Sequence, residues 1–292
     1  MTAWTPAFAS PVSVAEAASL LAAFPSATTR LLGGGTHVMS QLNDTTRTVT
    51  HLIDLSGIRE FRTIDQCDQT VTLGAAVTYT SLLSVKNSQC APPLLRKIAG
   101  WITGGPQIRN QGTIGGSACY ANPASDIPTG LLALEARMVC VSAERGVRIV
   151  DIDKFFKGAF LTTLADDELL TKIDVPVDRP GDVWGYAKLK TAESSWPVAV
   201  AAARLRKAAS GAWLAHVTIG ASTVVPTHVG TFEFSNDNDV GRETLAHIQE
   251  CVNSLPAGSF WTDELVSDSY RKRVASSAAF KAILDAFAER GN

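Results

Sequence analysis

The sequence lacks the features that would place it in a membrane or on nucleic acid. Its 292 residues contain no continuous apolar run of about 20 residues, the length that a helix needs to span a bilayer. Lys and Arg total 26 against 28 Asp and Glu, so the net charge of -2 argues against the basic surface of a general nucleic-acid-binding protein. The first residues lack the basic start and apolar core of a signal peptide, and we therefore expect a cytoplasmic protein.

Cysteine is present, but not in the spacings that build a disulfide framework or a cluster site. The five cysteines are an odd number, are widely spaced and form no C-x-x-C pair. This pattern argues against structural disulfides, a zinc site and an iron–sulfur cluster within the chain. We expect free thiols, and we expect Cys119 to be a small core residue, the alternative being a position near a ligand. The histidines also show no metal-ligand spacing, so no metal site is predicted.

The common nucleotide and hydrolase signatures are missing as well. No Gly-Lys-Ser or Gly-Lys-Thr occurs, which excludes a P-loop. A Rossmann pattern could start at Gly33 and Gly35, but Val38 stands where its third glycine belongs. No G-x-S-x-G elbow is found, so a hydrolase triad has no support in the sequence.

What the chain does have is two glycine-rich segments. Residues 107–117 hold three of the 22 glycines, and so many glycines predict a loop rather than the interior of a helix or strand. Because glycine has no Cβ, backbone N–H groups there can approach a ligand closely, and the hydroxyls of Thr113 and Ser117 can donate to an oxyanion. The alternative is a tight turn without a ligand.

The other glycine-rich segment, residues 31–38, lies between a predicted strand at 29–32 and a predicted helix at 37–42. Backbone donors and the helix dipole favour a phosphate at such a junction. Two segments of this kind in one chain indicate a ligand with two phosphates, although each could again be only a tight turn.

The residues of these segments carry a resemblance to a known family. The run I-R-N-Q-G-T-I-G-G at 108–116, followed by N-P-A-S-D at 122–126, resembles the second FAD loop of molybdenum hydroxylase flavoprotein subunits. These are the medium subunits of xanthine dehydrogenase-like and carbon monoxide dehydrogenase-like complexes. The run L-G-G-G-T at 32–36 resembles their first FAD loop. The resemblance covers nearly the whole chain and implies an α+β protein with a PCMH-type FAD-binding fold.

That fold would comprise two α/β subdomains, at 1–57 and 58–176, and a C-terminal α+β domain at 177–292 of the carbon monoxide dehydrogenase flavoprotein type. The composition after Pro176 agrees with the last boundary, because a polar linker at 178–182 precedes three predicted antiparallel strands at 184–190, 198–206 and 212–221. Helices are predicted at 241–252 and 263–287, and this order of strands and then helices resembles the C-terminal domain of the same subunits, an α+β unit that would cover one side of the flavin site. Earlier in the chain the patterns predict helices at 13–24 and 129–136 and strands at 48–55, 61–65 and 70–74.

The resemblance implies one non-covalently bound FAD and no catalytic or metal-binding residue in this chain. The implied cofactor contacts come from both glycine-rich segments and a few later positions: Leu31, Leu32, Gly33, Gly34, Gly35, Thr36, His37, Val38, Thr103, Gly112, Thr113, Ile114, Gly115, Gly116, Ser117, Asn122, Asp126, Leu170 and Lys188.

Three of these residues have titratable side chains, and the chemistry of each suggests a particular role. The carboxylate of Asp126 can accept from ribityl hydroxyls or adenine N–H groups, and its alternative role is to cap the following helix. Lys188 would lie near the N1–C2=O edge of the flavin and stabilise its anionic reduced form; the alternative is a solvated lysine at a sheet edge. His37 would act as a neutral donor, because the N-terminus of a helix disfavours a cation.

By resemblance, the chain is an FAD-binding electron-transfer subunit that passes electrons from [2Fe–2S] clusters through FAD to an external acceptor. Molybdopterin and the clusters are expected only on a large and a small partner subunit, within a dimer of heterotrimers. One alternative is a stand-alone flavin-dependent reductase or oxidase on the same fold, which would need a general acid near the flavin. Another is a structural subunit that has lost its flavin, against which both intact glycine runs argue.

Overall fold

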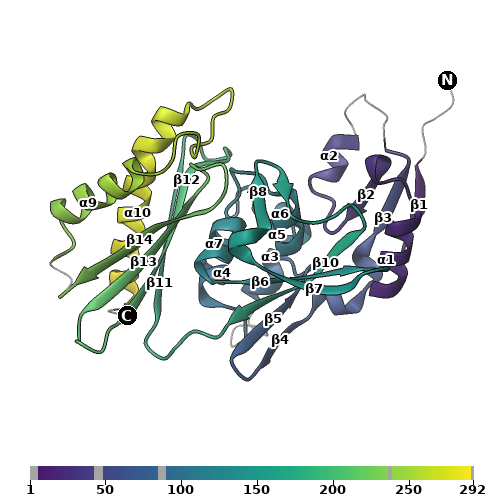
Figure 1. Ribbon diagram of the computed structural model, residues 1–292, viewed down its shortest axis with the longest axis horizontal. Helices are drawn as coiled ribbons and strands as arrows, with labels where there is room; N and C mark the ends of the chain where they lie inside the picture. Colours follow the sequence, from purple (N-terminus) through teal and green to yellow (C-terminus); the bar gives the residue numbers. More distant parts are fainter. Residues whose placement is uncertain (1–5, 43–48, 85–89, 236–238, 291–292) are drawn as a thin grey trace.

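The computed structural model describes residues 6–42, 49–84, 90–235 and 239–290. Its strands form three sheet-based units that follow one another along the long axis of the molecule, with the N-terminal unit at one end and the C-terminal unit at the other (Figure 1). Helices and sheets are mixed in each unit, as the α+β prediction requires. In the described part of the chain, no helix combines the length and apolar character needed to cross a bilayer.

The first unit is a three-stranded parallel sheet of order β1-β3-β2, formed by β1 (Ala7–Ala9), β2 (Thr29–Leu32) and β3 (His51–Asp54). Helix α1 (Val14–Ala23) begins after Ser13, whose hydroxyl accepts from the Glu16 backbone N–H, as the capping pattern predicts. The short helix α2 (Val38–Leu42) follows the first glycine segment. The strand predicted at 48–55 is β3, and residue 48 lies outside the described residues.

The second unit is a five-stranded antiparallel sheet of order β4-β5-β10-β6-β7. Its strands are β4 (Ile64–Cys67), β5 (Thr70–Gly74), β6 (Arg137–Ser142), β7 (Gly146–Asp151) and β10 (Glu168–Pro176). Its helices are α3 (Tyr79–Leu83), α4 (Pro93–Gly100), α5 (Gly105–Gln111), α6 (Ile114–Tyr120), α7 (Ile127–Ala133) and α8 (Ile152–Phe155). A small ladder of β8 (Phe156–Gly158) and β9 (Leu161–Thr162) and 3-10 turns at 26–28, 55–57 and 59–62 complete the two units.

Two predictions in this region need correction. The strand predicted at 61–65 begins only at Ile64, because residues 59–62 form a 3-10 turn that buries Phe61 completely in the core. The helix predicted at 129–136 begins two residues earlier, at Ile127, and ends at Ala133. Pro128 lies in its first turn, where the missing N–H costs nothing.

The third unit is a four-stranded antiparallel sheet of order β11-β12-β13-β14 covered by two helices. Its elements are β11 (Val183–Lys190), β12 (Pro197–Lys207), β13 (Trp213–Gly220), β14 (Thr227–Phe234), α9 (Arg242–Asn253) and α10 (Asp268–Arg290). The prediction of three strands missed the edge strand β14, whose alternation is interrupted by a register shift next to Gly230. Helix α10 begins at Asp268 and not at 263, since Asp263 lies in a turn and accepts from two following backbone N–H groups.

Strand β12 holds the second and third units together because both of its faces are buried. Ala199, Ala201 and Ala203 pack in the core that includes α10. Val200 and Ala202 point the other way, into the core of the second unit. The C-terminal sheet is therefore a layer between α10 and the second unit. This packing places β11, the strand next to β12, close to the cavity described below.

Candidate functional site

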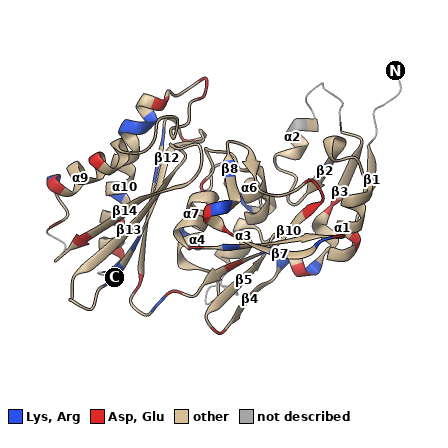
Figure 2. Cartoon of the chain, viewed as in Figure 1, with Lys and Arg blue, Asp and Glu red and all other residues tan. Residues whose placement is uncertain are grey.

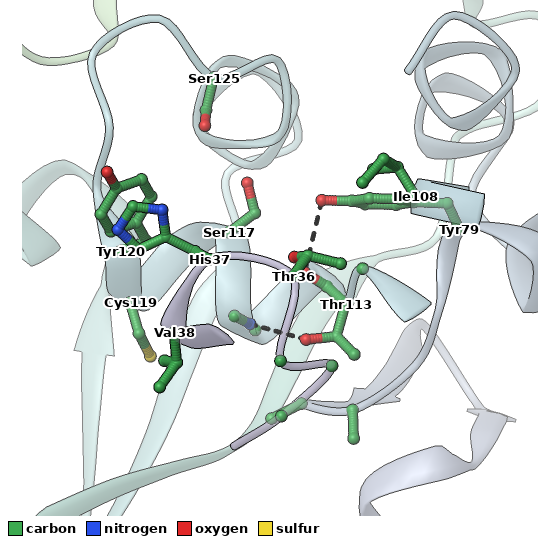
Figure 3. Close-up of a pocket in the computed structure, with 18 of the residues that line it drawn as sticks. Thr36, His37, Val38, Tyr79, Ile108, Thr113, Ser117, Cys119, Tyr120 and Ser125 are labelled. Carbon is green, nitrogen blue, oxygen red and sulfur yellow. Dashed lines mark hydrogen bonds between the residues drawn. The ribbon is translucent and has the colours of Figure 1, made fainter. Parts of the chain in front are cut away.

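A cavity of about 630 Å³ lies where the three units meet. Its walls come from β2 and the segment after it, from α3, α5 and α6, from the start of α7, from β10 and from the hairpin that joins β11 to β12. Figure 3 shows that both glycine-rich segments contribute to it, with the side chains of His37, Tyr120, Ser117 and Tyr79 around the central space.

The first glycine segment forms a loop that rests directly on the second segment. A Cβ at Gly34 would lie 1.7 Å from the Gln111 carbonyl oxygen, and a Cβ at Gly33 would lie 3.2 Å from Thr113 Oγ1. Gly35 has φ of +70°, a conformation that side chains other than glycine rarely adopt. Among the described residues, the backbone N–H groups of 34–37 have no protein acceptor. These donors border the cavity and suit a phosphate.

The second glycine segment is not a loop, and that prediction was wrong. It is a junction of two short helices, α5 and α6, and Gly115 and Gly116 lie in the first turn of α6. Thr113 caps this turn, with its Oγ1 accepting from Gly116 N at 3.0 Å (Figure 3). A Cβ at Gly115 would lie 2.5 Å from the Ala75 carbonyl oxygen, so glycine is needed there for helix packing.

The backbone donors of the second segment are used within the protein. Ile114 N donates to Val77 O at 3.0 Å, Gly115 N to Ala75 O at 2.9 Å, and Ser117 N to Thr113 O at 3.0 Å. The expectation that these N–H groups approach a ligand therefore needs correction. What this segment offers the cavity is a surface without side chains and the Ser117 hydroxyl.

Two buried polar atoms on the cavity wall have no partner among the described residues: His37 Nε2 and Thr103 Oγ1. Buried polar atoms normally have a hydrogen-bond partner, so both point to a ligand with polar groups. Burial lowers the pKa of His37, which favours the neutral imidazole that the sequence predicted. Its ring lies on Tyr120 with the centroids 3.5 Å apart. Together with the glycine loop, these atoms fit a dinucleotide such as FAD.

Asp126 enters the cavity wall from the start of α7 and is held by two residues of β11. It is 4% exposed, it forms an ion pair with Lys188 Nζ at 2.9 Å, and it accepts a short hydrogen bond from the Tyr186 hydroxyl. Burial and the nearby Asp126 raise the pKa of Tyr186 well above its usual value, which keeps the phenol protonated as a donor. Asp126 makes no side-chain cap on α7, so the capping alternative is wrong.

Lys188 is not a solvated lysine, because its side chain is 1% exposed. Its Nζ also donates to the Trp101 carbonyl at 2.9 Å. Although β11 is an edge strand, the lysine points into the contact between the second and third units. It does not line the cavity, which it reaches only through its partners.

Most of the residues implied by the resemblance line this one cavity. Four do not: Leu32, Ile114, Asn122 and Lys188. Leu32 ends β2, Ile114 is fully buried in the core, and Asn122 Oδ1 accepts from Ala124 N at 2.9 Å to shape the turn before Asp126. The other predicted residues on the wall are Leu31, Gly33, Gly34, Gly35, Thr36, His37, Val38, Thr103, Gly112, Thr113, Gly115, Gly116, Ser117, Asp126 and Leu170.

The sequence reading missed several aromatic residues of the site. Tyr79, Tyr120 and Trp196 line the cavity, and Trp196, at the β11–β12 hairpin, is 58% exposed. Tyr186 could have been found, because side chains two residues apart in a strand share a face and Lys188 was already singled out. Cys119 is exposed and lines the cavity, so its prediction as a core residue was wrong and the alternative position beside the cavity is the one observed.

Among the described residues, no cluster of metal-binding side chains accompanies the cavity. Lys, Arg, Asp and Glu are spread along the whole molecule, with both signs in each region (Figure 2). Within the described ranges, no group of three or more His, Cys, Asp or Glu side chains could hold a metal ion. The site is therefore characterised by its glycine loop, its polar wall and its aromatic lining.

Comparisons with known proteins agree with this geometry. Residues 5–178 match the family described as FAD binding domain in molybdopterin dehydrogenase. The carbon monoxide dehydrogenase medium chain of Hydrogenophaga pseudoflava is 36% identical over 217 residues, 74% of each chain. The xanthine dehydrogenase FAD-binding subunit of Escherichia coli O157:H7 is 35% identical over 62% of this chain and 60% of the relative.

Solved structures with the same fold align over the full length of the chain. The carbon monoxide dehydrogenase of H. pseudoflava that lacks the Mo-pyranopterin moiety aligns with a TM-score of 0.84 and 28% identity, covering 99% of both chains. Quinoline 2-oxidoreductase from Pseudomonas putida 86 shares the fold, with a TM-score of 0.86 at 24% identity over 100% of both chains.

The fold and the cavity thus define an FAD-binding oxidoreductase subunit. More specifically, the chain belongs to the FAD-binding medium-subunit family of the molybdenum hydroxylases, as the family match and the relatives show. The predicted family, fold class and FAD cofactor are confirmed.

Proposed function

We propose that this chain takes electrons from [2Fe–2S] clusters of a partner subunit and passes them through its FAD to an external acceptor. The observation that supports this most directly is one cavity, enclosed by both glycine segments, with a neutral histidine and a paired carboxylate on its wall. FAD supplies the two-electron redox chemistry when it is bound.

The residues of this chain bind and orient the cofactor. We assign the diphosphate to the loop at 33–37, whose residues line the cavity and whose N–H groups at 34–37 have no acceptor among the described residues, and to the Ser117 hydroxyl. His37 Nε2 and Thr103 Oγ1 supply further polar contacts. Tyr79, Tyr120 and Trp196 provide apolar surface that excludes water from the cofactor. The roles that we assign to these side chains are binding and orienting the cofactor, and none of them includes a reaction with an organic substrate.

For the same reason we place the organic substrate on a partner chain. Relatives are named medium chains or subunits, such as that of carbon monoxide dehydrogenase. We extend this to a large molybdopterin-binding subunit and a small [2Fe–2S] subunit, assembled as a dimer of heterotrimers. We also retain domains at 1–57, 58–176 and 177–292, because each larger sheet lies within one of these ranges.

The proposal is tested by reducing the flavin with substrate in the presence and absence of the partners. Candidate substrates are those for which relatives are named, such as carbon monoxide, xanthine and caffeine. In the assembled complex, one of them should bleach the visible flavin band under anaerobic conditions.

The purified chain loaded with FAD is the control. It should stay oxidised with every substrate and should bleach with dithionite. Substrate turnover by this chain, with partner proteins shown absent by mass spectrometry, would contradict the proposal and favour a stand-alone flavoenzyme.

A further inference from the structure

Two side chains of the C-terminal sheet converge on one carboxylate of the cofactor cavity. Tyr186 and Lys188 are two residues apart in β11 and therefore point to the same side of the sheet. The Tyr186 hydroxyl donates to Asp126 Oδ1, and Lys188 Nζ donates to Asp126 Oδ2 at 2.9 Å. Asp126 itself is nearly buried and lines the cavity. Both of its oxygens are thus held from behind the wall.

Lys188 fixes a second segment of the wall at the same time. Its Nζ donates to the Trp101 carbonyl at 2.9 Å, and the residues that follow, 102–104, line the cavity. Thr103 in this turn carries one of the two unpartnered buried polar atoms of the wall. One buried ammonium group therefore sets the position of both Asp126 and the turn of Thr103.

We propose that Tyr186 and Lys188 are positioning residues that hold Asp126 and the 102–104 turn ready for a hydroxyl or N–H donor of bound FAD, and that Lys188 acts on the cofactor only through them. The inference rests on the proposed FAD site and deepens it. A carboxylate oxygen has two lone pairs, so each Asp126 oxygen can accept one more hydrogen bond. Because an ionised carboxylate only accepts, its cofactor partner must be a donor, such as a ribityl hydroxyl or a ring N–H.

The burial of the pair predicts what happens when one member is removed. An ammonium and a carboxylate that are buried together stabilise each other, whereas a single buried charge is strongly unfavourable. Without Lys188, the buried carboxylate loses its charge partner and turns toward water, which moves the acceptor from its place at the wall.

The chain offers a matched control at the same contact between units. Lys97 of α4 pairs with Asp285 at 2.6 Å and with Glu289 at 2.9 Å, both on α10. Asp285 also accepts from the Tyr186 backbone N–H at 2.8 Å. Lys97 thus joins the second unit to the third, as Lys188 does, but it does not line the cavity or contact Asp126.

The test is a titration of flavin-stripped protein with FAD, using the full chain in the assembly in which it is purified. Lys188→Met should raise the FAD dissociation constant by at least about tenfold, because it leaves a buried charge unpaired. Lys97→Met should change it by less than about twofold, since it removes only a partly exposed ion pair. Asp126→Asn combined with Lys188→Met should weaken FAD binding by clearly less than the product of the two single effects, because the lysine acts in part through the carboxylate.

The midpoint potential of the bound FAD gives an independent measurement. A lysine that touches the flavin would stabilise its reduced anion, so its loss would lower the potential. A positioning role predicts the same potential in Lys188→Met and wild type. If Lys188→Met does not fold, Tyr186→Phe takes its place, with weaker FAD binding and the same coupling to Asp126→Asn.

Three results would overturn the inference: effects of Asp126→Asn and Lys188→Met that multiply, a lowered potential in Lys188→Met, or an equal loss of affinity in Lys97→Met. Failure of wild-type protein to bind FAD would instead contradict the proposed site, so the two failures are distinguishable.

Discussion

The two glycine segments of the cavity have similar composition but opposite local structures. The first is a loop after a parallel strand, and its N–H groups at 34–37 have no acceptor among the described residues. The second is the capped first turn of α6, and its N–H groups at 114–117 all donate to oxygens of the protein. Backbone N–H donors for an anion are thus available in the first segment. The second segment contributes a surface without bulky side chains.

The difference shows that glycine can serve packing as well as ligand approach. Gly34 allows the loop to touch the Gln111 carbonyl, and Gly115 allows α6 to touch Ala75. Neither position has room for a methyl group, yet in both cases the atom in the way belongs to the protein backbone. The cavity exists because glycine lets three backbone segments lie against one another.

The largest expected effect is that of Gly34→Ala. The new Cβ would lie 1.7 Å from the Gln111 carbonyl oxygen, so the two segments must separate. We expect a loss of about 3 kcal/mol or more in the free energy of unfolding, the upper range for overpacking, and loss of bound FAD. Chemical denaturation and the flavin content of purified protein measure both.

Gly33→Ala is the matched control for this variant. Its Cβ would meet only the Thr113 hydroxyl, at 3.2 Å, and a small shift relieves that contact. It should keep most of its stability. Equal destabilisation by both variants would mean that the loop does not rest on Gln111 as described.

An intermediate effect is expected within α6. Gly115→Ala places a methyl group 2.5 Å from the Ala75 carbonyl and should cost about 1–3 kcal/mol of unfolding free energy. Gly116→Ala meets the Thr113 hydroxyl at 2.7 Å and can lose a cap worth about 1 kcal/mol, which alanine offsets by its higher helix propensity. Denaturant midpoints of the two variants measure both losses of stability. A larger loss for Gly116→Ala than for Gly115→Ala would contradict the packing role of Gly115.

The smallest expected effect is the pH dependence of stability that His37, in the first glycine segment, contributes. Burial lowers the folded-state pKa of His37 below its usual 6.5, so the unfolded chain binds the proton more tightly. Its contribution to stability is therefore present above about pH 6.5 and is lost as the pH falls through that value toward the folded pKa. His37→Gln should remove this part of the pH dependence in flavin-free protein.

Thermal unfolding midpoints of wild type and His37→Gln, compared between about pH 7.5 and 5, measure this difference. The wild type should lose more stability on acidification than the variant. Parallel curves would show that His37 does not remain neutral at the cavity wall.

Local pattern was enough for the first unit except its strand β1 (Ala7–Ala9), which was not predicted, and for most of the C-terminal unit. Alternation and capping located α1, β2, β11 and β12, because these signals depend on neighbours along the chain. The strand predicted at 198–206 is β12, which differs from it by one residue at each end. The motifs around 33–36 and 112–116 placed the cofactor segments, and most of the residues they implied line one cavity.

What required the tertiary structure was every feature that depends on a distant partner. Gly115 lies in a helical turn where Ala75 O, far away in the sequence, accepts its N–H group, Val77 O accepts that of Ile114, and Ala75 leaves no room for a side chain. Asp126 contacts β11 rather than capping its own helix, since burial there is tolerable only with Tyr186 and Lys188 beside it. The sequence by itself determined which cofactor the chain binds, whereas long-range packing decided which atoms face the cofactor and which hold the wall.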